Sequence, residues 1–129
     1  MTTEKLNPAN IAAPVGAYSH GVLAPAGGRW LHVSGQIGMR PDGSLADGFA
    51  SQAEVAWENL LGVLRAANMD ASHLVKVTTY LVDGEHLKEL NAVRSRFLRS
   101  ERPASTLVVV KQLARPDWLF EVEAIAFAV

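Results

Sequence analysis

The chain has 129 residues, of which 49% are hydrophobic and 19% charged, and this suits a single globular domain over residues 1–129. It has no cysteine, which excludes disulfides, thiolate catalysis and Cys-ligated zinc. The formal net charge of −1 gives no support to tight nucleic-acid binding. No apolar run approaches the roughly 18 residues that cross a bilayer, and the N-terminus lacks the pattern of a secretory signal, so we expect a cytoplasmic protein with no membrane contact.

Two strands are predicted in the first third of the chain, over residues 19–24 and 29–37. In the second, apolar and polar residues alternate from Leu31 to Ser34, which is typical of a half-buried strand. The segment 25–28, Pro-Ala-Gly-Gly, has the composition of a turn. We therefore expect the two strands to form an N-terminal hairpin.

A helix is predicted next, from the capping box Ser51–Glu54 to about Asn68. Its apolar positions recur at helical spacing, which predicts one buried face. That face consists of Ala53, Ala56, Trp57, Leu60, Leu61, Leu64 and Ala67.

The second half of the chain predicts strands over 74–82, 105–111 and 119–129, and a helix over 85–98. The predicted buried stripe of this helix is Leu87, Leu90, Phe97 and Leu98. The strand 105–111 is apolar on both faces, so we expect the helices to cover one face and a second subunit the other.

The order β-β-α-β-α-β-β predicts an α+β fold, a single sheet with two helices packed on one face. Seven short motifs follow one another along almost the whole chain. They are Gly16–Ser19 (GAYS), Val33–Ile37 (VSGQI), Glu58–Leu60 (ENL), Val75–Thr78 (VKVT), Leu90–Val93 (LNAV), Arg102–Ala104 (RPA) and Val122–Ala126 (VEAIA). Together they resemble the Rid family, the reactive-intermediate deaminases also called YjgF-like proteins.

The resemblance implies a chorismate-mutase-like fold assembled as a homotrimer, with three small-molecule clefts between subunits. In the active branch of the family, enamine and imine products of pyridoxal-phosphate enzymes are hydrolysed to 2-oxo acids and ammonia without metal or cofactor. Glu121 matches the family glutamate that orients the attacking water. The substrate-binding positions are then Tyr18, Ser34, Gly35, Asn91, Ser105 and Thr106.

Ser105 departs from the pattern, because the deaminases of the family carry an arginine at this position. The planar fork of an arginine binds both oxygens of a substrate carboxylate, whereas a serine hydroxyl donates one neutral hydrogen bond. We expect carboxylate binding of the family type to be weaker by about tenfold or more, and the substrate preference to be altered. A Ser105→Arg variant then gains 2-imino acid deaminase activity if only the anchor is missing. The alternative is that the strand merely tolerates a small polar residue here.

Two arginines lie near Ser105 in the sequence. Arg102, three residues upstream, is predicted to point to the opposite face of the extended strand. Arg94 projects from the apolar stripe of the second helix, where relatives more often have an aromatic residue. We therefore expect Arg94 to reach into the cleft beside Asn91 and to bind an anionic ligand. The alternative is that its aliphatic stem packs while its head reaches water or a carboxylate of another subunit.

The remaining candidates also have structural alternatives. Glu121 could form an ion pair at a subunit interface instead of acting as a general base, and Glu123 is expected to have a structural partner. Tyr18 could be a core aromatic residue, and Ser34–Gly35 could be a bulge or a tight bend. The four histidines show no metal-type spacing, so we expect no metal site.

Three classes of function follow. The first is a hydrolase that resembles the deaminases and acts on the C–N bond of an enamine or imine, with no cofactor. The second is a trimer that binds a metabolite without turnover. The third, an endoribonuclease or a protein-interaction role, is the least supported because the net charge is near zero.

Overall fold

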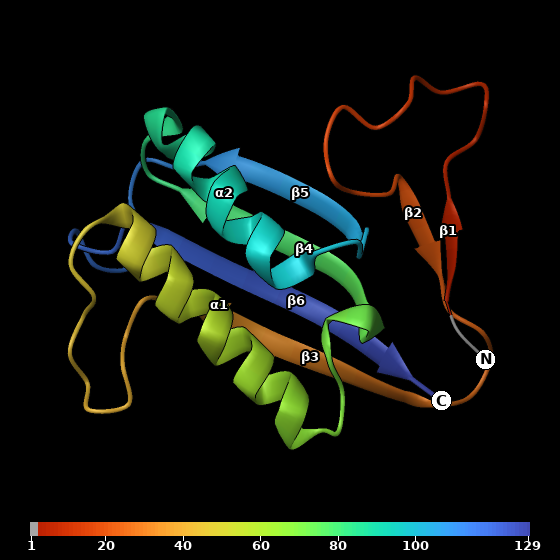
Figure 1. The fold of residues 1–129 in the computed structure, drawn as a ribbon, viewed down its shortest axis with the longest axis horizontal. Helices are drawn as coiled ribbons and strands as arrows, with labels where there is room; N and C mark the ends of the chain where they lie inside the picture. The colour runs from red at the N-terminus through yellow and green to blue at the C-terminus, as the bar shows by residue number, and fades with distance from the viewer. Residues whose placement is uncertain (1–2) are drawn as a thin grey trace.

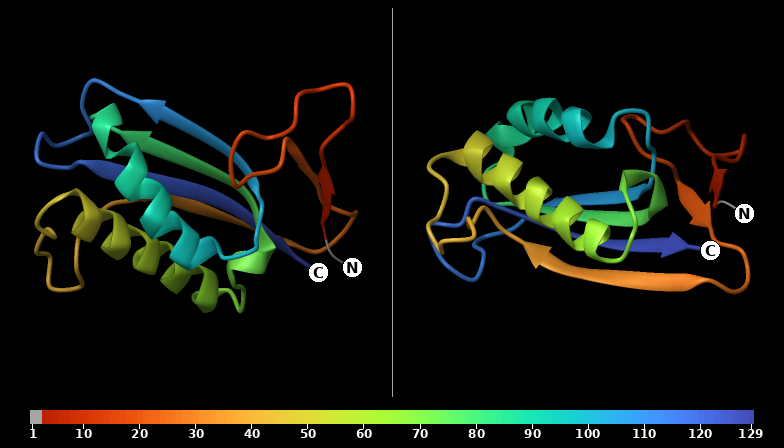
Figure 2. Two further views of the ribbon diagram at one scale, coloured as in Figure 1. Left: turned by 45° about the horizontal axis from the view of Figure 1, so that its top comes forward. Right: turned by 60° about the horizontal axis from the view of Figure 1, so that its bottom comes forward.

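The computed structural model describes residues 3–129 (Figure 1). The strands are β1 (Glu4–Leu6), β2 (Gly21–Leu23), β3 (Arg29–Gln36), β4 (Leu74–Leu81), β5 (Ala104–Val109) and β6 (Phe120–Ala128), and the helices are α1 (Phe49–Ala66) and α2 (Leu87–Leu98), with 3-10 turns at Ala71–His73 and Gly84–His86. Four strands form a sheet in the order β3-β6-β4-β5, in which only β4 and β5 run parallel. Both helices cover the same face of this sheet (Figures 1 and 2), which confirms the predicted α+β class.

The core lies between the helices and the sheet. Along β6, Phe120, Val122 and Ala124 point toward the helices and are buried, while Glu121 and Glu123 alternate with them on the other face. On α1, Trp57, Leu60 and Leu64 are completely buried against β6 and α2. The helical periodicity of the sequence therefore predicted most of the core correctly.

The start of α1 differs from the prediction. The helix begins at Phe49, directly after Gly48, whose φ of 85° is one that glycine adopts without strain. Ser51 lies inside the first turn and caps nothing, so the predicted capping box is wrong. Gln52 is buried. Its Nε2 donates a hydrogen bond to Asp117 O and its Oε1 accepts one from the N–H of Leu119, which fixes the loop before β6.

The buried stripe of α2 also differs in one member. Leu90 and Leu98 are buried as predicted, but Leu87 is 44% exposed because it occupies the first residue of the helix, at the rim of a cavity. Arg94, by contrast, is almost completely buried. The charged residue in the middle of the stripe thus points inward with its apolar neighbours.

The N-terminal segment forms a hairpin of its own. β2 pairs with β1 and not with β3, so the predicted hairpin of 19–24 with 29–37 is wrong. The reason is the anchor of Ser19, whose N–H donates to Pro103 O at 3.0 Å and whose hydroxyl donates to Arg102 O at 2.5 Å, beside the start of β5. Because β5 and β3 are opposite edges of the sheet, the chain leaving Ser19 is held away from β3.

Among residues 3–129, no helix lies over the second face of the four-stranded sheet (Figure 2). We call it the open face. It carries Trp30, which is 53% exposed, next to Phe127, and Val108, which is 38% exposed. Within residues 3–129, no helix is long and apolar enough to cross a membrane.

Candidate functional site

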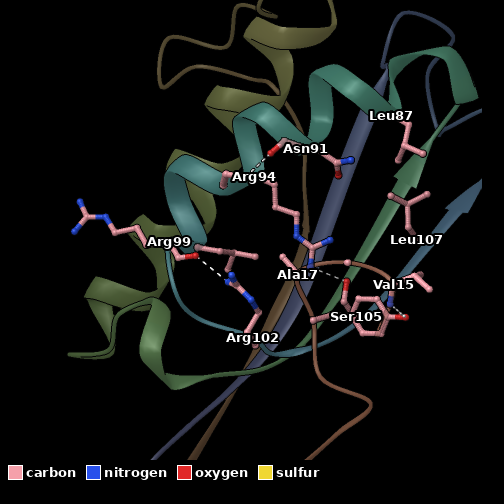
Figure 3. A pocket seen from close by; sticks show the side chains of 13 residues that line it. Val15, Ala17, Leu87, Asn91, Arg94, Arg99, Arg102, Ser105 and Leu107 are labelled. Atoms are coloured by element: carbon pink, nitrogen blue, oxygen red, sulfur yellow. Dashed lines mark hydrogen bonds between the residues drawn. The ribbon is translucent and has the colours of Figure 1, made fainter. Parts of the chain in front are cut away.

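A cavity of about 510 Å³ opens between α2, the start of β5 and the segment before β2 (Figure 3). We call it the helix-side cavity. Four residues that the sequence singled out line it: Tyr18, Asn91, Arg94 and Ser105. Sites for small metabolites span roughly 300–1,000 Å³, so the volume fits such a ligand.

Arg94 is the central charged group of the helix-side cavity, and 9% of its surface is exposed. Its Nη2 donates a hydrogen bond of 2.8 Å to Ser105 Oγ, and its buried Nε has no partner among the described residues. The salt bridges within residues 3–129 all involve other side chains. Burial, and then the nearby charge of Arg102, lower the pKa of Arg94. A buried cation with a single neutral partner is costly, and a bound anion would offset that cost.

Arg102 lines the same cavity as Arg94 and Ser105. The prediction that it points to the opposite face is therefore wrong. β5 begins only at Ala104, so the alternation of a strand does not extend back to Arg102. Its Nη1 donates to Arg99 O at 2.8 Å and to Glu101 O at 2.9 Å, which holds the guanidinium beside the end of α2.

The segment before β2 forms the wall opposite α2. Tyr18 lies in it, with its hydroxyl accepting a hydrogen bond of 3.3 Å from the N–H of Val15 and its ring edge-on to His20. The bonds of Ser19 to Pro103 O and Arg102 O attach this wall to the link that carries Arg102. The aromatic ring and the second arginine are thus held in place by the same short segment.

Glu121 lies on the open face, half-buried above Gly35 of β3. A Cβ built on Gly35 would lie 1.8 Å from Glu121 Oε2, so only glycine leaves room for this carboxylate. The register of β3 on β6 shifts between Val33 and Gln36, so Ser34 and Gly35 form the bulge that was the alternative for this pair. Burial, and then the charge of Glu123, raise the pKa of Glu121 above 4.5. A carboxylate in this state is a better proton acceptor than an ordinary glutamate.

The neighbours of Glu121 on the open face are paired within the chain. Glu123 accepts a hydrogen bond of 2.5 Å from the hydroxyl of Tyr80, the structural partner that the sequence led us to expect. Thr106 accepts one of 2.6 Å from Lys76 Nζ. Glu121 has no such partner among residues 3–129, so its carboxylate oxygens are free to accept a hydrogen bond.

The predicted site residues therefore form two groups. Tyr18, Asn91, Arg94 and Ser105 lie on the helix side, and Ser34, Gly35, Thr106 and Glu121 lie on the open face. The sheet separates the groups within one copy of the chain. In the described range 3–129, no cluster of three or more His, Asp or Glu side chains is arranged to hold a metal ion.

Several lining residues were missed at the level of sequence. Leu107 could have been found, because it lies two residues after Ser105 on the same face of a strand. Leu87 and Arg102 were assigned elsewhere, to the buried stripe and to the opposite face, and Val15 gave no signal. They come from a loop, a helix start and a link, whose positions depend on tertiary contacts.

Comparison with known proteins identifies the wider group. The family model described as Endoribonuclease L-PSP matches residues 9–128. The chain is 33% identical over 120 residues to a RutC family protein of Pyrococcus horikoshii, with 92% of each chain covered. It is 31% identical over 123 residues to the 2-iminobutanoate/2-iminopropanoate deaminase of Homo sapiens, with 94% of this chain and 87% of the relative covered.

Solved structures give the same result. YyfB from Yersinia pestis, a Rid family protein of unknown function, superimposes with a TM-score of 0.88 at 29% identity, covering 99% of this chain and 100% of YyfB. A family model that covers nearly the whole chain, relatives above 30% identity and a shared fold all agree. The chain therefore belongs to the Rid family of YjgF-like proteins.

Proposed function

We propose that this protein hydrolyses the C–N bond of small anionic enamines or imines in sites formed between copies of the chain. The observation that carries the proposal is Arg94, a buried guanidinium with one neutral partner in a cavity of metabolite size. The deaminase of Homo sapiens, at 31% identity over most of the chain, supports the reaction class.

The anion is bound by Arg94 together with Ser105. The hydroxyl of Ser105 already accepts a hydrogen bond from Arg94 Nη2, so its own proton is free to point to a ligand oxygen. The cation thus comes from α2 instead of from position 105, where the resemblance expects an arginine. This shift of the charge alters which substrates fit, since the anchored carboxylate lies closer to α2. The amide of Asn91 and the ring of Tyr18 line the space for the rest of the substrate.

Glu121 supplies the proton transfer. A protonated imine has an electrophilic carbon, and the attack of a positioned water on that carbon forms a C–O bond. Glu121 accepts the proton that the water loses, helped by its raised pKa. Glu121 returns this proton to the nitrogen, and the C–N bond breaks as the hydroxyl oxygen forms the carbonyl and gives up its proton to the departing ammonia, so a 2-oxo compound and ammonium leave. Water is the only co-reactant.

The reaction needs two copies because the sheet separates Glu121 from Arg94 within one copy. A homotrimer brings the open face of one copy to the helix-side cavity of the next. The exposed Trp30 and Val108 on the open face support this, because large apolar side chains in that position favour burial against another subunit.

A second candidate function is binding of a metabolite without turnover. The observation that favours it is the same separation: a single copy has a complete anion anchor but no carboxylate in the helix-side cavity. It predicts saturable binding that raises the melting temperature without product. An endoribonuclease role gains no support from the near-neutral charge.

The test is complementation between two inactive variants. At subsaturating, freshly generated 2-aminoacrylate, Glu121→Gln and Arg94→Met are each expected to retain about 1% or less of the wild-type enzymatic rate of ammonia release. Co-refolding them at equal amounts places an intact Arg94 next to an intact Glu121 in about a quarter of the sites of a random trimer. We expect about that fraction of the wild-type activity to return.

The outcomes separate the candidates. Recovery of activity on mixing shows that the site is shared between copies. Failure to recover, with both variants folded and trimeric, refutes the shared site. A wild type that binds 2-oxobutanoate saturably but releases no ammonia selects the second candidate function.

A further inference from the structure

Two guanidinium groups converge on the helix-side cavity. Arg94 reaches it from the middle of α2, and Arg102 reaches it from the link between α2 and β5 (Figure 3). Arg99 also lines the cavity, but Figure 3 shows its guanidinium extending away from Ser105. The cavity is therefore lined by the buried guanidinium of Arg94 and by the more exposed guanidinium of Arg102, while that of Arg99 extends away.

Arg102 is held in place with unused donors. Its Nη1 donates to two backbone carbonyls, those of Arg99 and Glu101. The backbone carbonyl of Arg102 accepts a hydrogen bond from the hydroxyl of Ser19. Neither Nη2 nor Nε of Arg102 makes a hydrogen bond to any residue in the described part of the chain. The guanidinium is thus fixed on one side and free to bind on the other, which reduces the entropy lost when a ligand binds.

Within one copy, no described residue that lines the cavity offsets the two charges. Its lining includes Arg94, Arg99 and Arg102 but no aspartate or glutamate. The groups are close enough that the charge of Arg102 depresses the pKa of Arg94. Two like charges around one space repel each other, and that repulsion is relieved when each faces an anion. One carboxylate on Arg94 and Ser105 would leave Arg102 without an anionic partner.

We infer that the ligand of this site carries two anionic groups, one bound by Arg94 and Ser105 and the other by Arg102. The preferred substrate class is then a dicarboxylic 2-imino acid or its enamine, ahead of the monocarboxylic compounds named for the human relative. This inference rests on the proposed function for the reaction, but it concerns binding alone. The volume of about 510 Å³ accommodates an acid of four or five carbons.

The test compares two stable product analogues by isothermal titration calorimetry. They are 2-oxobutanoate, with one carboxylate, and 2-oxoglutarate, with two. We expect the wild type to bind 2-oxoglutarate at least about tenfold more tightly, the gain from one charge-assisted hydrogen bond. Arg102→Gln should reduce this ratio to near one by weakening 2-oxoglutarate only.

Arg99→Gln is the matched control. It removes the same unit of charge three residues away, from a guanidinium that points out of the cavity, so the ratio should keep its wild-type value. Equal affinities in the wild type, no binding of 2-oxoglutarate, or the same change in both variants would each overturn the inference. The proposed function is judged separately, by ammonia release in the complementation assay, which does not depend on this ratio.

Discussion

The two faces of the sheet differ in the chemistry they carry. The helix-side cavity is concave and cationic, with Arg94 and Arg102 held by neutral partners. The open face is covered by no helix and carries carboxylates, of which Glu123 is paired with Tyr80 and Glu121 is not. One region is suited to holding an anion, and the other to moving a proton.

This difference explains why neither region is a complete site by itself. An anion anchor without a base binds and does not react, and a base without an anchor has no positioned substrate. Neither Arg94 nor Glu121 has a partner of opposite charge among residues 3–129, and burial shifts the pKa of each toward its neutral form. The proposed assembly brings them into one cleft, and each prediction below alters one region while leaving the other intact.

The largest effect is expected from Glu121→Gln, which changes only the open face. Removal of the general base should lower kcat by about 10²-fold to 10⁴-fold while leaving the affinity for 2-oxobutanoate unchanged. Steady-state ammonia release and calorimetry measure the two quantities. An equal loss of kcat and of affinity would mean that Glu121 acts in ligand binding or in subunit assembly instead.

The pH dependence of the wild type checks the same assignment. The carboxylate form of Glu121 is the active one, and its pKa is raised above 4.5 by burial and by Glu123. kcat/KM should therefore rise with pH, with a midpoint above 4.5, and Glu121→Gln should lack this rise. A midpoint at or below that value would contradict the role.

Arg94→Met changes only the helix-side cavity and comes next in size. We expect it to weaken anion binding by about 100-fold, the loss of a strong charge-assisted contact. Because it replaces an unneutralised buried cation by an apolar side chain of similar length, it should also stabilise the ligand-free protein by about 1 kcal/mol or more. Thermal unfolding measures the gain in stability, and calorimetry measures the loss of anion affinity.

Arg94→Lys is the companion variant, since it keeps the charge but loses the planar fork. It should retain part of the affinity and none of the gain in stability. If Arg94→Met instead lowers the melting temperature and leaves binding intact, Arg94 is a packing residue and the cavity needs another anchor.

Gly35→Ala tests how tightly the open face positions its carboxylate. The added Cβ would lie 1.8 Å from Glu121 Oε2, so the end of that flexible side chain must swing away. We expect kcat to fall by about tenfold or more from misplacement alone, with little change in melting temperature or ligand affinity. Gly62→Ala in α1, where the new Cβ meets only Arg65 at 3.7 Å, is the control and should change neither rate nor affinity.

Periodicity made the sheet, the helices and the buried face of α1 predictable, because 2-residue and 3.6-residue patterns reflect which side of an element is buried. The N-terminal hairpin was not predictable, since the turn at 25–28 is a local signal and the anchor of Ser19 on Pro103 is a contact distant in sequence. The predicted orientation of Arg102 was wrong because the alternation of side chains along a strand does not apply before the start of β5.

For the candidate site, the resemblance supplied the residues but not their separation. Sequence could place Glu121 and Arg94 in one cleft only by reference to the family, because a single chain puts the sheet between them. The contact of Arg94 with Ser105 is a finding of the structure. It shows that Ser105 is a hydrogen-bond partner of Arg94.

That contact changes what Ser105→Arg should do, and the expected net effect is the smallest of the series. From sequence, an arginine at this position should restore a family anchor. In the structure, it would place a second guanidinium where Ser105 Oγ lies 2.8 Å from Arg94 Nη2, so the two cations repel. We expect the single variant to lower the melting temperature without improving affinity for 2-oxobutanoate.

The double variant Arg94→Phe/Ser105→Arg moves the cation from α2 to β5 and should recover stability and bind 2-oxobutanoate within about threefold of the wild type. A double-mutant cycle on melting temperature and affinity measures this coupling; strict additivity of the two substitutions would show that Arg94 and Ser105 act independently.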